Sequence, residues 1–151
     1  MLFRVEADIA QPPERVFAFL RDIDQVPRDP ASVVPVLEKT SSGPYGVGST
    51  FHEVVRVLPR RTAEIHSEIT RFEAPTRLDY AFTWRLGPAE LDGELRYELE
   101  RARAGVTHLV QTQTLRPRGA LRLLAPLIRW TFGRRIARRL RALKAQLEAP
   151  R

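Results

Sequence analysis

The stretch ALRLLAPLIRWTFGRRIARRLRALKAQLEAPR, residues 120–151, decides the fold that this chain can adopt. Its apolar side chains recur at spacings of three and four residues, which is the period of one face of an α-helix. They are Leu121, Leu124, Ile128, Phe132, Ile136, Leu140, Leu143 and Leu147. The spacing predicts an amphipathic helix over residues 121–147, about 40 Å long, against which the rest of the chain can pack.

The two halves of this predicted helix differ. The apolar stripe of the first half points about 110° away from that of the second, and Pro126 and Gly133 lie near the transition, where they could introduce a kink. Leu123, Leu127 and Trp130 make the first half apolar on its other side as well. Two interpretations stay open. Either the sheet rim and loops bury both sides, or the second side is a movable lid or a membrane contact.

Short strands fill the chain before this helix. Residues 2–9 alternate between apolar and charged side chains, as in a half-buried strand, and the prolines that follow suit the start of a helix over residues 13–21. One further helical turn is expected at residues 23–26. Turn signals separate the later strands, which we expect at residues 33–39, 49–58, 61–72, 77–86, 89–101 and 106–116. The order predicts an α+β fold, in which a seven-stranded antiparallel meander wraps around the long C-terminal helix.

The composition is that of one globular domain over residues 1–151. The absence of cysteine excludes disulfides and thiolate metal sites. The sequence has neither a signal-peptide pattern nor an apolar stretch long enough to span a membrane, so we expect a cytoplasmic protein. The net charge of +7 is uneven, because residues 116–151 carry 11 basic side chains and Glu148 as their one acidic side chain. This basic helix is either a solvated face or a surface for anionic membranes or nucleic acid.

The order of elements and four segments resemble the START-like superfamily, also called SRPBCC, and especially its polyketide cyclase/dehydrase branch. The segments are VEADIAQPPERVFAFLRDID (5–24), YGVGSTFHEVV (45–55), FEAPTRLDYAF (72–82), and LRPRG (115–119) leading to LKAQLE (143–148). The resemblance implies a helix-grip fold, in which a curved sheet grips the C-terminal helix and encloses an apolar cavity with it. Most members bind hydrophobic small molecules, and some catalyse aromatic ring closure or dehydration.

Strand alternation assigns side chains to the inner face, which would meet the helix. That face is apolar and aromatic, but it also receives Glu53, Ser67, Gln111 and Gln113. An unpaired buried polar group costs about 1–3 kcal/mol. We therefore expect these four side chains to bond to tyrosines or water, to be turned outward by a register slip, or to contact a ligand. A small-molecule site usually combines apolar walls with a few polar groups. The predicted ligand-binding residues are Phe51, Glu53, Ser67, Tyr80, Phe82, Trp84, Leu95, Tyr97, Gln111, Gln113, Ile128 and Phe132.

Acid–base chemistry has one weak candidate, Glu53, because burial among apolar side chains would favour the protonated carboxyl group at neutral pH. It could equally be a hydrogen-bonded core glutamate. His52, His66 and His108 are all predicted to point outward, where they share no obvious site. No metal-ligand spacing joins them, so we predict neither a metal nor a cofactor.

Three functions follow, in order of preference. The first is non-catalytic binding of a hydrophobic small molecule (a lipid, an isoprenoid or a polyketide-like aromatic) in a cavity between sheet and helix. The second is a cyclase or dehydratase that uses the same cavity, with Glu53, Tyr80 and Tyr97 handling protons. The third is a surface-binding protein whose basic helix contacts a membrane or RNA. Nucleic acid is the less favoured of these partners, because few aromatic side chains near the helix could stack on bases. The arginines concerned are Arg134, Arg135, Arg138, Arg139 and Arg141. The sequence leaves the ligand, and the choice between monomer and homodimer, open.

Overall fold

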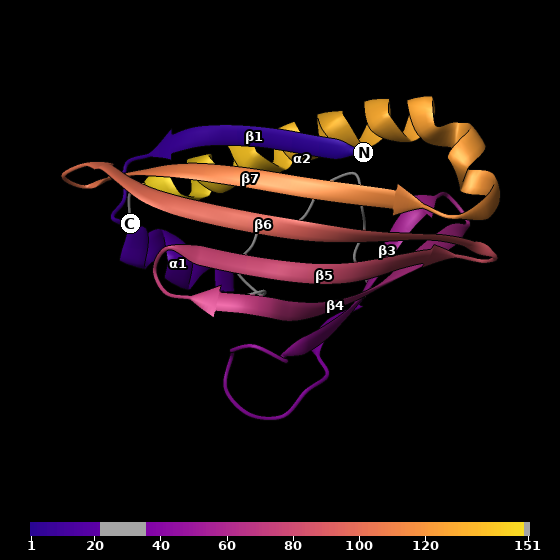
Figure 1. The fold of residues 1–151 in the computed structure, drawn as a ribbon, viewed down its shortest axis with the longest axis horizontal. Helices are drawn as coiled ribbons and strands as arrows, with labels where there is room; N and C mark the ends of the chain where they lie inside the picture. Colours follow the sequence, from indigo (N-terminus) through magenta and orange to yellow (C-terminus); the bar gives the residue numbers. More distant parts are fainter. Residues whose placement is uncertain (22–35, 150–151) are drawn as a thin grey trace.

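The computed structural model describes residues 1–21 and 36–149, whose seven strands form one antiparallel sheet in the order β1-β7-β6-β5-β4-β3-β2. The strands are β1 (Leu2–Ile9), β2 (Val36–Lys39), β3 (Thr50–Leu58), β4 (Arg61–Glu73), β5 (Arg77–Leu86), β6 (Ala89–Arg103) and β7 (Val106–Pro117). The helices are α1 (Pro13–Arg21), the 3-10 helix η1 (Gly119–Leu124) and α2 (Ala125–Glu148). Figure 1 shows α2 along one face of the sheet, behind β1 and β7. The predicted α+β meander on a C-terminal helix is confirmed.

The start of the closing helix differs from the prediction, and two predicted features cannot be compared. The helical turn expected at residues 23–26, like the start of the strand expected at 33–39, lies outside the described residues. The closing helix is not continuous from residue 121, because the chain first forms η1 and α2 begins only at Ala125. Pro126 occupies the first turn of α2, where a missing N–H needs no helical partner. This proline therefore starts the α-helix instead of kinking it.

The buried apolar side chains form two clusters and not one continuous core. The first packs α1 and the C-terminal half of α2 against the sheet. Its helical members are Val16, Phe17, Leu20, Leu140, Leu143 and Leu147. The second surrounds Trp84 and receives η1 and the N-terminal half of α2 through Leu121, Ile128 and Phe132. Each fully buried leucine or phenylalanine contributes roughly 1.5–3 kcal/mol, so both ends of α2 are held to the sheet by apolar contacts.

Polar contacts fix the C-terminal end of α2 to the end of β1. Glu148 accepts a hydrogen bond of 3.0 Å from the backbone N–H of Ala10, and it pairs with Lys144 at 3.1 Å. These two contacts lower the pKa of the Glu148 carboxyl group. The side-chain amide of Gln11 donates to the carbonyl oxygen of Leu147 at 2.9 Å. The helix end is thereby tied to a segment that is distant in sequence.

Four apolar side chains of η1 and of the N-terminal half of α2 are exposed, and we call them the helix patch: Leu123, Leu124, Leu127 and Trp130. Leu123 is 84% exposed and Trp130 is 60% exposed, so the sheet rim does not bury both sides of this half. The guanidinium of Arg134 lies 4.9 Å from the centre of the Trp130 ring. Among the described helices, α2 included, none combines the length and the hydropathy that crossing a bilayer requires.

Candidate functional site

One row of the inner face runs across the middle of the sheet. Phe51 on β3 pairs with Ser67, Ser67 with Phe82, and Phe82 with Gly93 on β6. The ring of Phe82 extends over Gly93, into the space that a β-carbon would take. The absence of a side chain at Gly93 therefore gives the aromatic ring room to lie along the inner face.

Two tyrosines and two glutamines occupy the adjoining rows. Tyr97 pairs with Gln111, while Leu95 pairs with both Tyr80 and Gln113. Gln111 is buried, whereas Gln113 and Leu95 keep partial exposure. The carboxamide group of each glutamine can both donate and accept hydrogen bonds, so either could bind a polar group of a ligand.

The tyrosines of this site are hydrogen-bond donors at neutral pH. Burial raises the pKa of the Tyr80 and Tyr97 phenol groups above the ordinary value, so both stay protonated. The positive charge of Arg139 on α2 opposes this shift for both phenols, although burial outweighs it. Arg139 is thus close enough to act on the inner face, a role that the sequence did not predict. Tyr80 also donates to the carbonyl oxygen of Leu20, at 3.5 Å.

Glu53 and Trp84 belong to a third row. Glu53 pairs with Ile65 on β4, and Ile65 pairs with Trp84 on β5. Glu53 is only partly buried, so the burial expected of an acid–base residue is incomplete. Trp84 is 9% exposed, and its indole N–H is a buried donor that has no partner in the described part of the chain. An unpaired buried donor costs about 1–3 kcal/mol, and a ligand oxygen or a water molecule beside Trp84 would remove that cost.

Some inner-face side chains beside the two apolar clusters keep partial exposure. The inner-face residues of intermediate exposure include Phe3, Val5, Glu53, Ile65, Ser67, Phe82, Leu95 and Gln113. Ser67, Phe82 and Leu95 are on β4, β5 and β6, strands in the interior of the sheet order, so their exposure is not that of an edge strand. Leu78 and Leu115, on the same face, are completely buried. Most predicted site residues belong to the clusters or pack against them. Phe51, Tyr80 and Tyr97 are in the first cluster and Trp84 is in the second, while Leu95 packs against the first and Phe82, Ile128 and Phe132 against the second.

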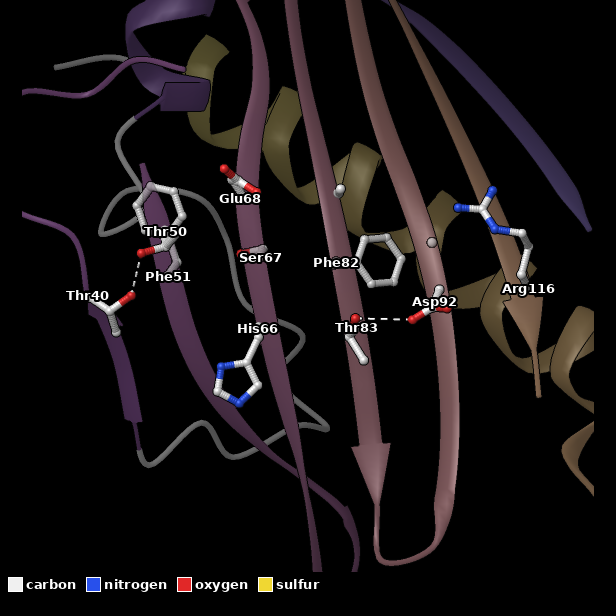
Figure 2. Close-up of a pocket in the computed structure, with 12 residues that line it drawn as sticks. Thr40, Thr50, Phe51, His66, Ser67, Glu68, Phe82, Thr83, Asp92 and Arg116 are labelled. Carbon is white, nitrogen blue, oxygen red and sulfur yellow. Dashed lines mark hydrogen bonds between the residues drawn. The ribbon is translucent and has the colours of Figure 1, made fainter. Parts of the chain in front are cut away.

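The sequence did not predict a groove of about 490 Å³ at the outer face of the sheet, which is also lined by Phe51, Ser67, Phe82 and Gly93 of the inner-face row (Figure 2). Its outward-pointing side chains include Thr50, His66, Glu68, Thr83, Asp92 and Arg116. Thr83 donates a hydrogen bond of 3.1 Å to Asp92, and strand pairing brings Asp92 opposite Arg116. Alternation predicts that these residues point outward. Their alignment across five strands depends on register, which alternation does not determine.

A curved antiparallel sheet closed by a C-terminal helix, with an apolar and aromatic inner face, defines the helix-grip class of START-like proteins. Within that class the chain belongs to the polyketide cyclase / dehydrase and lipid transport family, whose model matches residues 2–148. The resemblance predicted from the sequence is confirmed. A comparison with the sequences of curated proteins finds no match.

Solved structures share this fold over nearly the whole chain. A protein from Rhizobium leguminosarum is 19% identical with a TM-score of 0.75, over 98% of this chain and 94% of its own. A conserved protein from Geobacillus kaustophilus is 12% identical with a TM-score of 0.73, over 97% and 95%. The Zhui aromatase/cyclase from a Streptomyces species is 15% identical with a TM-score of 0.67, over 99% and 96%. At these identities the likeness concerns the fold alone.

Proposed function

We propose that the protein binds a hydrophobic small molecule, such as a lipid, an isoprenoid or a polyketide-like aromatic, between the inner face of the sheet and α2. The observation that carries this proposal is the partial exposure of Ser67, Phe82 and Leu95 in the middle of the inner face. Apolar walls that remain accessible to solvent are expected where an apolar ligand is to be bound. Membership in a family described by cyclase, dehydrase and lipid-transport activities supports the same function.

The polar groups of the inner face would orient the ligand. The indole N–H of Trp84 lacks a partner among the described residues, and the amide groups of Gln111 and Gln113 can donate and accept hydrogen bonds. They suit a ligand whose apolar body contacts Phe82 and Leu95 and whose carbonyl or hydroxyl oxygens accept hydrogen bonds. A pure hydrocarbon would leave the indole N–H of Trp84 unpaired, so we expect an oxygen-bearing ligand.

Binding is better supported than cyclase or dehydratase catalysis. Catalysis of this kind needs a base at neutral pH, whereas burial keeps Tyr80 and Tyr97 protonated. Glu53 is the remaining candidate, and it is only partly buried. If the protein is an enzyme that uses this carboxylate, the Glu53→Gln variant should lose turnover and retain ligand binding. Equal turnover would exclude Glu53 as the catalytic residue.

Native mass spectrometry of the untagged protein, followed by organic extraction, would identify a ligand carried from the cell. A direct test uses the apolar fluorescent probe N-phenyl-1-naphthylamine. Ser67→Leu adds bulk to the inner face and should weaken probe binding about tenfold or more, whereas Glu68→Leu changes the adjacent outward-pointing position and should bind as the wild type does. Unchanged binding by Ser67→Leu, or loss in Glu68→Leu alone, would contradict an inner-face site.

The helix patch favours a second function, contact with an anionic membrane surface. Leucine and tryptophan side chains partition into the interfacial region of a bilayer, and nearby arginines are attracted to anionic headgroups. Arg122, Arg129 and Arg134 are exposed beside the patch. The patch and the inner-face site would together suit a carrier that takes up its ligand at a membrane. Sedimentation with phosphatidylglycerol vesicles tests this contact.

A further inference from the structure

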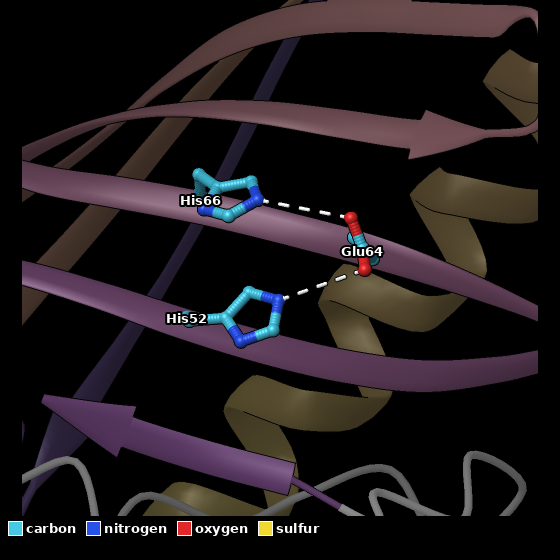
Figure 3. Close-up of side chains that lie close together, drawn as sticks. All are labelled: His52, Glu64 and His66. Carbon is cyan, nitrogen blue, oxygen red and sulfur yellow. Dashed lines mark ion pairs between the residues drawn. The ribbon is translucent and has the colours of Figure 1, made fainter. Parts of the chain in front are cut away.

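Two histidines and a glutamate meet on the outer face of the sheet, away from the ligand site. His52 on β3 and His66 on β4 are cross-strand partners, and their rings stack with centroids 4.7 Å apart and planes 23° apart. Figure 3 shows the carboxylate of Glu64 opposite both rings. The Nε2 atom of His52 lies 4.0 Å from one carboxylate oxygen, and the Nε2 atom of His66 lies 3.9 Å from the other.

We propose that His52, Glu64 and His66 bind a divalent transition-metal ion, with Zn²⁺ as the ion best suited to them. Two imidazole nitrogens and one carboxylate oxygen are a frequent zinc ligand set, with bonds of about 2.0–2.2 Å. Here one ligand atom from each residue lies within 4.8 Å of the others. Ligand atoms on one tetrahedral ion are about 3–3.5 Å apart. Small side-chain rotations would close the difference, and both Glu64 and His66 are exposed enough to make them.

The distances in this cluster do not fit ordinary hydrogen bonds. N–H···O hydrogen bonds span about 2.7–3.2 Å, so neither His52 nor His66 donates to Glu64 at 3.9–4.0 Å. The carboxylate faces two ring nitrogens without bonding to either. An ion between them would be coordinated by all three side chains.

Glu38 lies on the side of His52 where a metal-binding histidine usually has a supporting carboxylate. It pairs with His52 across β2 and β3, and one of its carboxylate oxygens lies 3.6 Å from the Nδ1 atom of His52. At 3.6 Å the two groups are at ion-pair distance and are not hydrogen-bonded. A side-chain rotation that brought Glu38 to hydrogen-bond distance in the metal-bound protein would hold a proton at Nδ1 and direct the lone pair of Nε2 toward the ion.

His108 provides the contrast within the same chain. Its Nδ1 atom lies 2.7 Å from Asp8 and its Nε2 atom 3.4 Å from Glu6, so both ring nitrogens face carboxylates at ion-pair distance. No second histidine belongs to this group among the residues that the structure describes. His108 therefore forms an ordinary surface ion pair and serves as the matched control.

The bound ion would connect three strands at one edge of the sheet, β3 and β4 directly and β2 through Glu38. His66 also lines the outer-face groove, so the remaining coordination positions, filled by water, would lie beside that groove. Because the unfolded chain does not hold these ligands together, the ion should stabilise the folded protein.

The experiment is calorimetric titration of the untagged full-length protein with zinc chloride in a non-chelating buffer at neutral pH, with thermal unfolding measured in parallel. We expect one ion per chain and a rise in Tm with zinc. His52→Ala and His66→Ala should each lower the affinity at least about tenfold and Glu38→Gln by about tenfold, while His108→Ala should bind zinc as the wild type does.

Thermal unfolding of each variant without zinc shows whether it folds, so a lost site is distinguishable from a lost structure. The absence of saturable zinc binding at micromolar concentrations would overturn the proposal. So would unchanged affinity in both His52→Ala and His66→Ala, or a loss of binding in His108→Ala.

Discussion

The ring of Phe82 on β5 occupies the space that a β-carbon of Gly93 on β6 would need. The carbonyl oxygen of Thr114 on β7 limits the same position, 2.6 Å from where that carbon would lie. A β-carbon at residue 93 would therefore be crowded by a side chain on one side and by backbone on the other. This contact determines where the Phe82 ring lies on the inner face, and the ring in turn forms part of the proposed ligand site.

Replacing Gly93 by alanine should destabilise the fold, because the backbone at Thr114 must shift as well as the ring. We expect a loss of about 1–3 kcal/mol in the free energy of unfolding, measured by chemical denaturation. Gly46→Ala is the control, since a β-carbon there has no atom within 4 Å and the backbone does not have a positive φ. Equal effects of the two substitutions would show that crowding at Gly93 is not the cause.

Two leucines of α2 should respond very differently to truncation. Leu140 is 5% exposed and belongs to the first apolar cluster, whereas Leu127 is 57% exposed. Leu140→Ala should cost about 2–5 kcal/mol in the free energy of unfolding, and Leu127→Ala less than about 0.5 kcal/mol. A large cost at Leu127 would indicate that the helix patch is covered in the folded protein.

The two tryptophans allow the membrane contact to be observed directly. In Trp84→Phe the remaining fluorophore is Trp130, which is 60% exposed in the helix patch. Its emission should move to shorter wavelength on phosphatidylglycerol vesicles, because the indole leaves water for the bilayer interface, and high salt should weaken the effect.

The reciprocal variant, Trp130→Phe, reports on Trp84 and should show no shift with the same vesicles. Neutral phosphatidylcholine vesicles should give a weaker response in Trp84→Phe. A response that is equal for both lipids, or equal for both tryptophans, would count against an electrostatic contact through the helix patch.

The ion pair of His108 should make stability depend on pH. The hydrogen bond that His108 donates to the carboxylate of Asp8, assisted by Glu6, raises the pKa of His108 above the ordinary value of 6.5. The folded protein therefore binds the proton more tightly than the unfolded chain. The stabilisation is fully present below the unfolded pKa, about 6.5, and is lost as pH rises through the raised folded pKa.

Asp8→Asn should bring the pKa of His108 down toward 6.5, as measured by NMR titration of its ring protons. The gain in unfolding free energy on going from about pH 8 to pH 6 should shrink accordingly. Glu68→Gln, on a distant part of the outer face, should leave the titration of His108 unchanged. If Asp8→Asn has no effect, Glu6 or Glu100, which is opposite His108 on β6, must cause the shift.

The sequence alone determined the elements and their faces. Strand alternation predicted Tyr80, Trp84 and Tyr97 on the inner face, and the three- and four-residue spacing predicted the buried stripe that includes Leu140 and Leu143. These predictions succeed because periodicity is a local property of the backbone. The 3-10 helix before α2 was missed because its residues continue the helical spacing, and the start of α2 depends on where Pro126 enters the first turn.

Only the tertiary structure decided which residues meet. Arg56 pairs with Thr62 while Leu58 pairs with Arg61, so a β-bulge shifts the register of β3 and β4 by one residue. Without that shift His52 would stand opposite Ser67, which points to the other face, and not opposite His66. A residue's face follows from its own strand, but its neighbour depends on irregularities elsewhere in the hairpin. For that reason the histidine pair, the outer groove and the exposed side of α2 follow from the fold and not from the periodicity of the chain.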